Sequence, residues 1–201
     1  MNKLAVDVVL LPPNEINNQA ILINKSLNPK EGEVVFENGD MLPHISLLMG
    51  VLDASRQKDA ETLIKNVSKK FTALPLEISG IDVVTLNNEQ RASGFRIQAT
   101  PVLKKLHQHL LLESEAFLGN DAEAEMFLGK PIREGSIEYT RNFRKKSSFE
   151  NFHPHLTLGI GEAKTSMRFP VCFIADTIAL CHLGNYNTCR KILFSAKLGN
   201  L

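Results

Sequence analysis

A five-residue pattern of proline, histidine, an aliphatic residue, a hydroxyl residue and leucine occurs twice in this chain, as PHISL at 43–47 and PHLTL at 154–158. Both copies lie in apolar runs that are typical of β-strands. Because alternate residues of a strand point to the same side, each copy would separate its histidine and hydroxyl from its aliphatic residues. The pattern therefore predicts two strands that each present an imidazole beside a hydroxyl.

The strand period also predicts which neighbours of each copy are buried. In the first copy we expect a core face of Ile45, Leu47, Met49 and Val51, opposite His44 and Ser46. In the second we expect an apolar face of Phe152, Pro154, Leu156, Leu158 and Ile160, opposite Asn151, His153, His155, Thr157, Gly159 and Gly161. The two glycines on that second face would leave room for a ligand against the backbone.

Hydrophobic periodicity along the rest of the chain predicts a mixture of strands and helices. We expect a strand at 4–11, a helix at 14–27, a hairpin that joins a strand at 33–36 to the first motif through Asn38–Gly39, a helix at 54–73, strands at 74–86 and 93–99, a helix from Pro101 that carries Leu103, Leu106, Leu110 and Phe117, and final strands at 171–183 and 188–198. Residues 119–150 show little regularity and are expected to be rich in loops. This order predicts an α+β fold of two similar lobes, with residues 1–201 as one bilobal domain.

The charge balance and the cysteines restrict the class of protein. With 23 basic and 22 acidic residues, the net charge of +1 gives no overall field that would hold long nucleic acid. Asp7 interrupts the apolar N-terminal stretch, which is expected to be a strand, and no apolar run reaches the length of about 18 residues that a membrane-spanning helix needs. Cys172, Cys181 and Cys189 form no CxxC pair and are expected to be reduced, buried thiols of a cytoplasmic protein, which we expect to be a monomer.

Paired imidazoles are suited to phosphodiester chemistry without a metal ion. One imidazole can take a proton from the attacking oxygen while the other gives a proton to the leaving oxygen, and the reference pKa of about 6.5 makes both forms accessible near neutral pH. A hydroxyl beside each ring can donate a hydrogen bond to a non-bridging phosphate oxygen. We therefore predict His44 and His155 as the acid–base pair, and Ser46 and Thr157 as phosphate-binding residues.

The motifs His44–Ser46 and His155–Thr157 resemble the paired His-x-Ser/Thr motifs of the 2H phosphoesterase superfamily, the group of the 2′-5′ RNA ligases and cyclic nucleotide phosphodiesterases. The resemblance implies two antiparallel sheets flanked by helices, with the motifs on opposed strands that line a central cleft. It also implies cofactor-free hydrolysis of 2′,3′-cyclic phosphate or 2′,5′-phosphodiester bonds of nucleotides or RNA ends, with ligation as the reverse reaction in some members. Ser46 stands where threonine is commoner, and either hydroxyl can donate the required bond.

Candidate contacts with the rest of a substrate lie in residues 139–152, which lead into the second motif. Basic side chains there could bind phosphate and aromatic side chains could stack on a base. The candidates are Tyr139, Arg141, Phe143, Arg144, Lys145, Lys146 and Phe149. A basic run of this kind is equally typical of a solvated surface, and the sequence leaves both interpretations open.

The other histidines receive less specific predictions. His153 shares a face with the second motif and fits either a role at the cleft or simple exposure. His107 and His109 lie two apart on a predicted helix, point to different sides and are expected at the surface. His182 fits no zinc spacing and is expected to be structural.

Two other functions compete with a phosphodiesterase. The first is a nucleotide- or RNA-end-binding module that uses the imidazoles only as hydrogen-bond donors, although both motifs are intact. The second is a metallohydrolase with His44, His153 and His155 as ligands, although neither motif contains a carboxylate to complete a site. The sequence does not distinguish the base from the acid.

Overall fold

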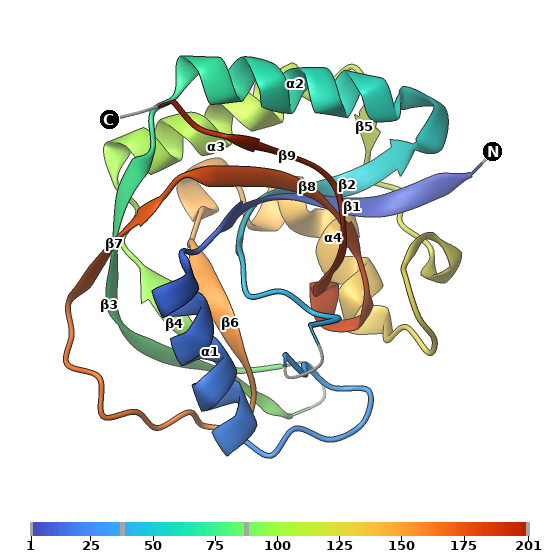
Figure 1. The fold of residues 1–201 in the computed structure, drawn as a ribbon. Helices are drawn as coiled ribbons and strands as arrows, with labels where there is room; N and C mark the ends of the chain where they lie inside the picture. The colour runs from blue at the N-terminus through green and yellow to red at the C-terminus, as the bar shows by residue number, and fades with distance from the viewer. Residues whose placement is uncertain (1, 37–38, 87–88, 200–201) are drawn as a thin grey trace.

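One curled sheet of nine antiparallel strands runs through the part of the chain that the computed structural model describes, residues 2–36, 39–86 and 89–199. The strands are β1 (Lys3–Leu11), β2 (Ile45–Asp53), β3 (Leu74–Thr85), β4 (Arg91–Ile97), β5 (Leu118–Gly119), β6 (His155–Ile160), β7 (Val171–Ala175), β8 (Thr177–Leu183) and β9 (Cys189–Lys197). The helices are α1 (Asn14–Ser26), α2 (Gln57–Lys70), α3 (Pro101–Glu113) and α4 (Glu134–Lys146), with 3₁₀ turns η1 (Ala54–Arg56), η2 (Ala124–Met126), η3 (Phe149–Asn151) and η4 (Asn185–Asn187). Across the sheet the order is β7-β3-β4-β6-β2-β1-β8-β9, and β5 pairs with β2 (Figure 1).

The sheet has two halves, and the two motif strands lie where these halves meet. β2 and β6 are neighbours, and the register pair that joins them is Ile45 with Leu156. One half contains β7, β3, β4 and β6, and the other contains β2, β1, β8 and β9. The α+β prediction is confirmed, and the two expected sheets are the two halves of this single curled sheet.

The helices cover opposite faces of the sheet. α2 and α3 lie side by side (Figure 1), and their apolar residues join the main core with residues of β2 and β8. α1 packs against β6 through Ile16, Ala20 and Ile23, at the helical spacing that the sequence predicts. α4 packs on the other face of β2, where Ile137 and Phe143 enter a second apolar cluster. The cleft described below lies on the α4 side.

Irregular pairing between β1 and β2 changes the predicted faces of the first motif strand. Val8 pairs with Leu48 and Val9 pairs with Ser46, so Leu47 is an extra residue in β2. As a result both Leu47 and Leu48 join the main core, while Met49 turns toward α4. The prediction that Met49 and Val51 share the face of Ile45 is therefore wrong beyond Leu47.

A second irregularity, between β4 and β6, alters the predicted glycine face. Ser93 pairs with Gly159 and Gly94 pairs with Thr157, which leaves Leu158 as the extra residue. Gly159 consequently faces α1 rather than the cleft. It adopts a φ of +147°, and a Cβ there would lie 2.8 Å from Asn24 Nδ2. The predicted cleft role of this glycine is wrong, because its lack of a side chain allows α1 to approach.

Three element predictions also differ from the structure. Residues 33–36 form no strand, because Val34 and Phe36 are held by hydrogen bonds to the Asn24 side chain instead of a partner strand, and Asn38 of the expected turn lies outside the described residues. The stretch 119–150 contains α4, whose buried residues include Ser136 and Thr140, so its apolar period is weak. The strand expected at 171–183 ends at Ala175 and resumes at Thr177; the first part pairs with β3 and the second with β1.

The cysteines also depart from expectation. Cys181 and Cys189 form a disulfide across the turn between β8 and β9, and Cys172 is a free, exposed thiol. Cys181 and Cys189 are buried as expected but are not reduced, and Cys172 is reduced as expected but is not buried. Because disulfides are typical of oxidising compartments, the thiols no longer support a cytoplasmic location. None of the helices in the described part of the chain has the length and hydropathy needed to cross a membrane.

Candidate active site

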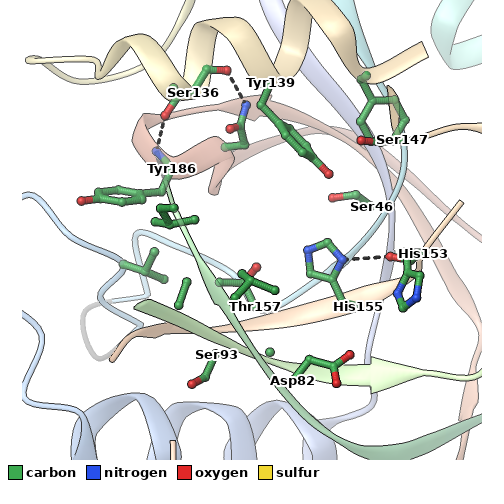
Figure 2. Close-up of a pocket in the computed structure, with 18 of the residues that line it drawn as sticks. Ser46, Asp82, Ser93, Ser136, Tyr139, Ser147, His153, His155, Thr157 and Tyr186 are labelled. Carbon is green, nitrogen blue, oxygen red and sulfur yellow. Dashed lines mark hydrogen bonds between the residues drawn. The ribbon is translucent and has the colours of Figure 1, made fainter. Parts of the chain in front are cut away.

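A pocket of about 840 Å³ lies between the two halves of the sheet, and both sequence motifs line it (Figure 2). His44 and Ser46 enter it from the start of β2, and His155 and Thr157 enter it from β6. α4, η4 and the ends of β3 and β4 complete its walls. The fold thus brings the two distant pentapeptides to a single cavity, of a size that accepts a small-molecule ligand.

The His44 ring is held firmly and is mostly buried. Its Nδ1 lies 2.7 Å from the carbonyl oxygen of Leu42, and the Leu42 amide in turn donates to the Cys189 carbonyl oxygen at 3.0 Å. A carbonyl oxygen can only accept, so Nδ1 carries the proton and Nε2 is left as the free nitrogen. Burial lowers the pKa of His44 to about 4, and the nearby His155 contributes in the same direction while the Leu42 carbonyl opposes it.

The His155 ring repeats this local geometry in a more open setting. Its Nδ1 lies 3.0 Å from the carbonyl oxygen of His153, again two residues earlier, so its Nε2 is also the free nitrogen. Gly94 of β4, which pairs with Thr157, lies beside the ring, and a Cβ there would lie 3.1 Å from the Leu156 carbonyl oxygen and 3.7 Å from the His155 ring. The two motifs therefore present two rings in the same tautomer, with His44 mostly buried and His155 exposed.

The two hydroxyls and Tyr139 lie around the same space. Figure 2 shows Ser46, Thr157 and Tyr139 directed into the pocket near His155. Within the described residues the Thr157 hydroxyl has no protein hydrogen-bond partner, so it can donate to a ligand. Burial raises the pKa of Tyr139, and the Ser147 hydroxyl partly opposes this effect. The Tyr139 hydroxyl consequently stays protonated and can also donate.

Only some of the candidate substrate contacts in residues 139–152 face the pocket, because α4 directs the others away from it. Tyr139, Phe143 and Lys146 line the pocket, and their proposed contacts with substrate remain predictions. Other members point elsewhere: Arg141 donates to the Ala122 carbonyl oxygen, and Arg144 donates to that of Leu111.

The remaining candidates of that segment also lie away from the pocket. Arg141 is paired with Glu134, and Arg144 is paired with Glu115 and lies over the Phe149 ring. Lys145 and Phe149 are absent from the described lining of the cavity. Most of these residues lie on a helix rather than in the expected loop. One side of that helix therefore faces the pocket, and the arginines on its other sides bind carbonyl and carboxylate oxygens elsewhere.

His107 is the clearest correction among the other histidines, because it is fully buried rather than at the surface. Its Nδ1 donates to the Leu47 carbonyl oxygen at 2.7 Å, its Nε2 accepts from the Phe149 amide at 3.1 Å, and its ring stacks on Phe152 at 3.8 Å. It therefore joins the first motif strand to the segment before the second motif. Helical spacing from Leu103 to Leu110 contains the signal, since position 107 lies on the same face.

The other histidine predictions are resolved in part. His153 is exposed at the pocket, so both of its predicted roles remain open. His109 is half-buried against the Phe71 ring. His182 is buried and its Nε2 contacts the Met126 carbonyl oxygen at 2.9 Å, which suits the expected structural role. No group of three or more metal-ligating side chains occurs within the ranges described.

The far end of the pocket is built from residues that no sequence pattern indicated. There the Arg133 guanidinium lies 4.3 Å from the centre of the Tyr186 ring. The Tyr186 amide donates to the Ser136 hydroxyl, and Asn187 Nδ2 donates to Ser136 and Thr140, so η4 is fixed to α4. These residues are distant from both motifs in sequence, and only the packing of η4 on α4 assembles them.

Comparison with known proteins gives a result at the level of structure. No family model matches the chain, and no curated protein matches its sequence. The structure is similar to TT0787 of Thermus thermophilus, with 15% identity over 98% of this chain and 99% of that chain and a TM-score of 0.63. It is also similar to E. coli LigT complexed with ATP, with 16% identity over 98% and 99% of the two chains and a TM-score of 0.59. The chain has a LigT-like fold.

Another structural relative of this LigT-like fold is described as a phosphoesterase, with 15% identity over 98% of this chain and 99% of that chain and a TM-score of 0.54. The fold predicted from the resemblance to the 2H phosphoesterases is thereby confirmed. In the LigT-like chain the meeting of β2 and β6 places both motifs at one cavity.

Proposed function

We propose that this protein is a metal-independent phosphodiesterase that hydrolyses 2′,3′-cyclic phosphate or 2′,5′-phosphodiester bonds of nucleotides or RNA ends, with ligation as the reverse reaction. The observation that carries the proposal is the pair of imidazoles, each with Nδ1 bound to a backbone carbonyl, in one pocket. Structures of E. coli LigT complexed with ATP, 3′-AMP and NADP+ support a nucleotide-type ligand. Both motifs come from one chain, so a monomer suffices.

The proposed reaction divides proton transfer between the rings. The Nε2 of one histidine takes the proton of the attacking water as the new P–O bond forms, and the other histidine protonates the leaving ribose oxygen. Ser46 and Thr157 donate to the non-bridging oxygens, where negative charge accumulates. In ligation a ribose 5′-hydroxyl would attack the 2′,3′-cyclic phosphate in place of water, with one imidazole taking its proton and the other protonating the departing ribose oxygen.

Turnover assays on a panel of 2′,3′-cyclic nucleotides and 2′,5′-linked dinucleotides test the proposal. We expect hydrolysis of at least one class, unchanged after thorough chelation. Binding without turnover across the whole panel would instead support a nucleotide-binding module. Activity that is lost on chelation and restored by a divalent cation would support a metallohydrolase.

We expect the far end of the pocket to hold the nucleobase, with Tyr186 as the stacking surface. Tyr186→Ala should raise KM by about 5- to 150-fold with little change in kcat, because base–aromatic stacking contributes about 1–3 kcal/mol. Steady-state kinetics on the best nucleotide of the panel provide the measurement. Tyr186→Phe is the matched control, since it keeps the ring and loses only the hydroxyl that donates to Gln90. Equal KM values for the two variants would contradict the stacking role.

A further inference from the structure

Asp7 is a buried carboxyl group that the proposed mechanism leaves unused. It lies in the middle of β1, fully buried, opposite Met49 on the side of the sheet that faces the cleft. Within the described residues neither of its oxygens has a hydrogen-bond partner of normal geometry. A buried polar group without such a partner is costly and rare, so its presence in this sheet calls for a physical reason.

The groups around Asp7 point to His44. The His44 Nε2 lies 3.8 Å from Asp7 Oδ2. The Ser46 hydroxyl and the amides of Leu47 and Leu48 also face the carboxyl, and they only partly oppose the rise in the pKa of Asp7 that burial causes. The extra residue in β2 therefore directs polar groups at Asp7 without fully satisfying it.

Titratable groups on the other neighbouring elements contribute less. On α4, electrostatic repulsion by a charged Asp7 raises the pKa of Tyr139 further. From β8, the residue opposite Asp7 is Cys181, which is held in the disulfide and does not titrate. From β6, His155 acts on His44 and lowers the pKa of that ring. Lys146 lines the same pocket.

The protonation states of Asp7 and His44 follow from this arrangement. On its own, a His44 ring with a pKa of about 4 would be unprotonated near neutral pH and could act only as a base. Asp7 has the opposite tendency, because burial disfavours its charged form. With one proton the two groups together are neutral, either as carboxylic acid and imidazole or as carboxylate and imidazolium. Both forms avoid an isolated buried charge.

We propose that Asp7 and His44 hold one proton between them, and that this proton makes His44 the general acid and leaves His155 as the base. The inference rests on the proposed function. In the carboxylate–imidazolium form, His44 Nε2 gives its proton to the leaving oxygen as the P–O bond breaks, and the Asp7 carboxylate 3.8 Å away stabilises the imidazolium charge until that transfer. His155 Nε2 takes the proton of the attacking water. After the products leave, His155 releases that proton to solvent and the Asp7–His44 pair takes one up. Asp7 touches no reacting atom and is a positioning residue.

The pH profile of kcat/KM for Asp7→Asn on a 2′,3′-cyclic nucleotide tests this role. We expect a loss of about 10²- to 10³-fold at pH 7 that shrinks about tenfold for each pH unit down to pH 5, because the lone His44 ring binds a proton only near pH 4. Asp176→Asn, which removes an exposed carboxylate paired with Lys197, is the matched control and should keep the wild-type profile. A loss that is the same at every pH would overturn the inference.

A second measurement needs neither a variant nor a substrate. Carbon-13 NMR of the Asp7 carboxyl in the wild-type protein should show titration clearly above the ordinary aspartate pKa of about 3.9. Titration at or below that value would overturn the shared proton, even if the enzyme is active. Absence of turnover across the substrate panel would refute the proposed function instead, and the NMR titration would still decide whether Asp7 holds the proton.

Discussion

His44→Ala and His155→Ala should each lower kcat/KM on the active cyclic or 2′,5′-linked substrate by about 10²- to 10⁴-fold, the usual contribution of a general acid or base. Each change removes the free Nε2 on one side of the pocket and leaves the other ring in place. Because the two residues act in one step, the double variant should lose little more activity than the poorer single variant.

The folded state should survive both substitutions. His44→Ala removes one hydrogen bond to a backbone carbonyl, which contributes about 1 kcal/mol, and His155 is exposed. Circular dichroism melts of the variants separate catalysis from stability. His109→Ala, on α3 and outside the described lining of the pocket, is the matched control and should keep wild-type turnover. A near-normal rate for either motif variant on the true substrate would refute the paired-histidine mechanism.

The strand period predicted much of the fold and both halves of the site, because local alternation decides which side chains of a strand can share a face. It succeeded at Ile45 and Ser46, where the chain is regular, and failed at Met49, beyond the extra residue in β2. A bulge depends on how two strands pair, and Val8 and Leu48 are far apart in sequence. Periodicity within one strand therefore contains no signal for it.

The sequence alone could predict neither the helix α4 nor the proximity of Asp7 to His44, for related reasons. α4 buries two hydroxyl residues, Ser136 and Thr140, beside Ile137 and Phe143, so its sequence lacks a continuous apolar stripe. In the sequence Asp7 is only an interruption of an apolar run. Its position beside His44 depends on the register of β1 and β2, which tertiary packing determines.

Asn24→Ala should lower the free energy of unfolding by about 3–5 kcal/mol. Asn24 is buried in α1, and its Nδ2 donates to the carbonyl oxygens of Val34 and Leu158, each at 2.8 Å. Its Oδ1 accepts from the Phe36 amide at 3.1 Å. Truncation leaves these three backbone groups buried and unpaired, at a cost of about 1–3 kcal/mol each.

The irregular pairing of β6 explains why a buried amide side chain is needed at position 24. Leu158 is the extra residue opposite β4, so its carbonyl oxygen needs a partner from outside the ladder, and Asn24 supplies it. The same side chain fixes residues 34–36, which have no partner strand, against the edge of the pocket. Loss of Asn24 should therefore release both Thr157 and this segment, and kcat should fall together with stability.

Urea unfolding of Asn24→Ala measures the loss of stability, and a decrease of about 10 °C in Tm should accompany it in a chain of this size. Asn18→Ala, on the exposed side of the same helix, is the matched control and should leave stability nearly unchanged. A change below about 1 kcal/mol for Asn24→Ala would mean that water replaces all three bonds. The buried amide would then not be what holds α1, residues 34–36 and β6 together beside the site.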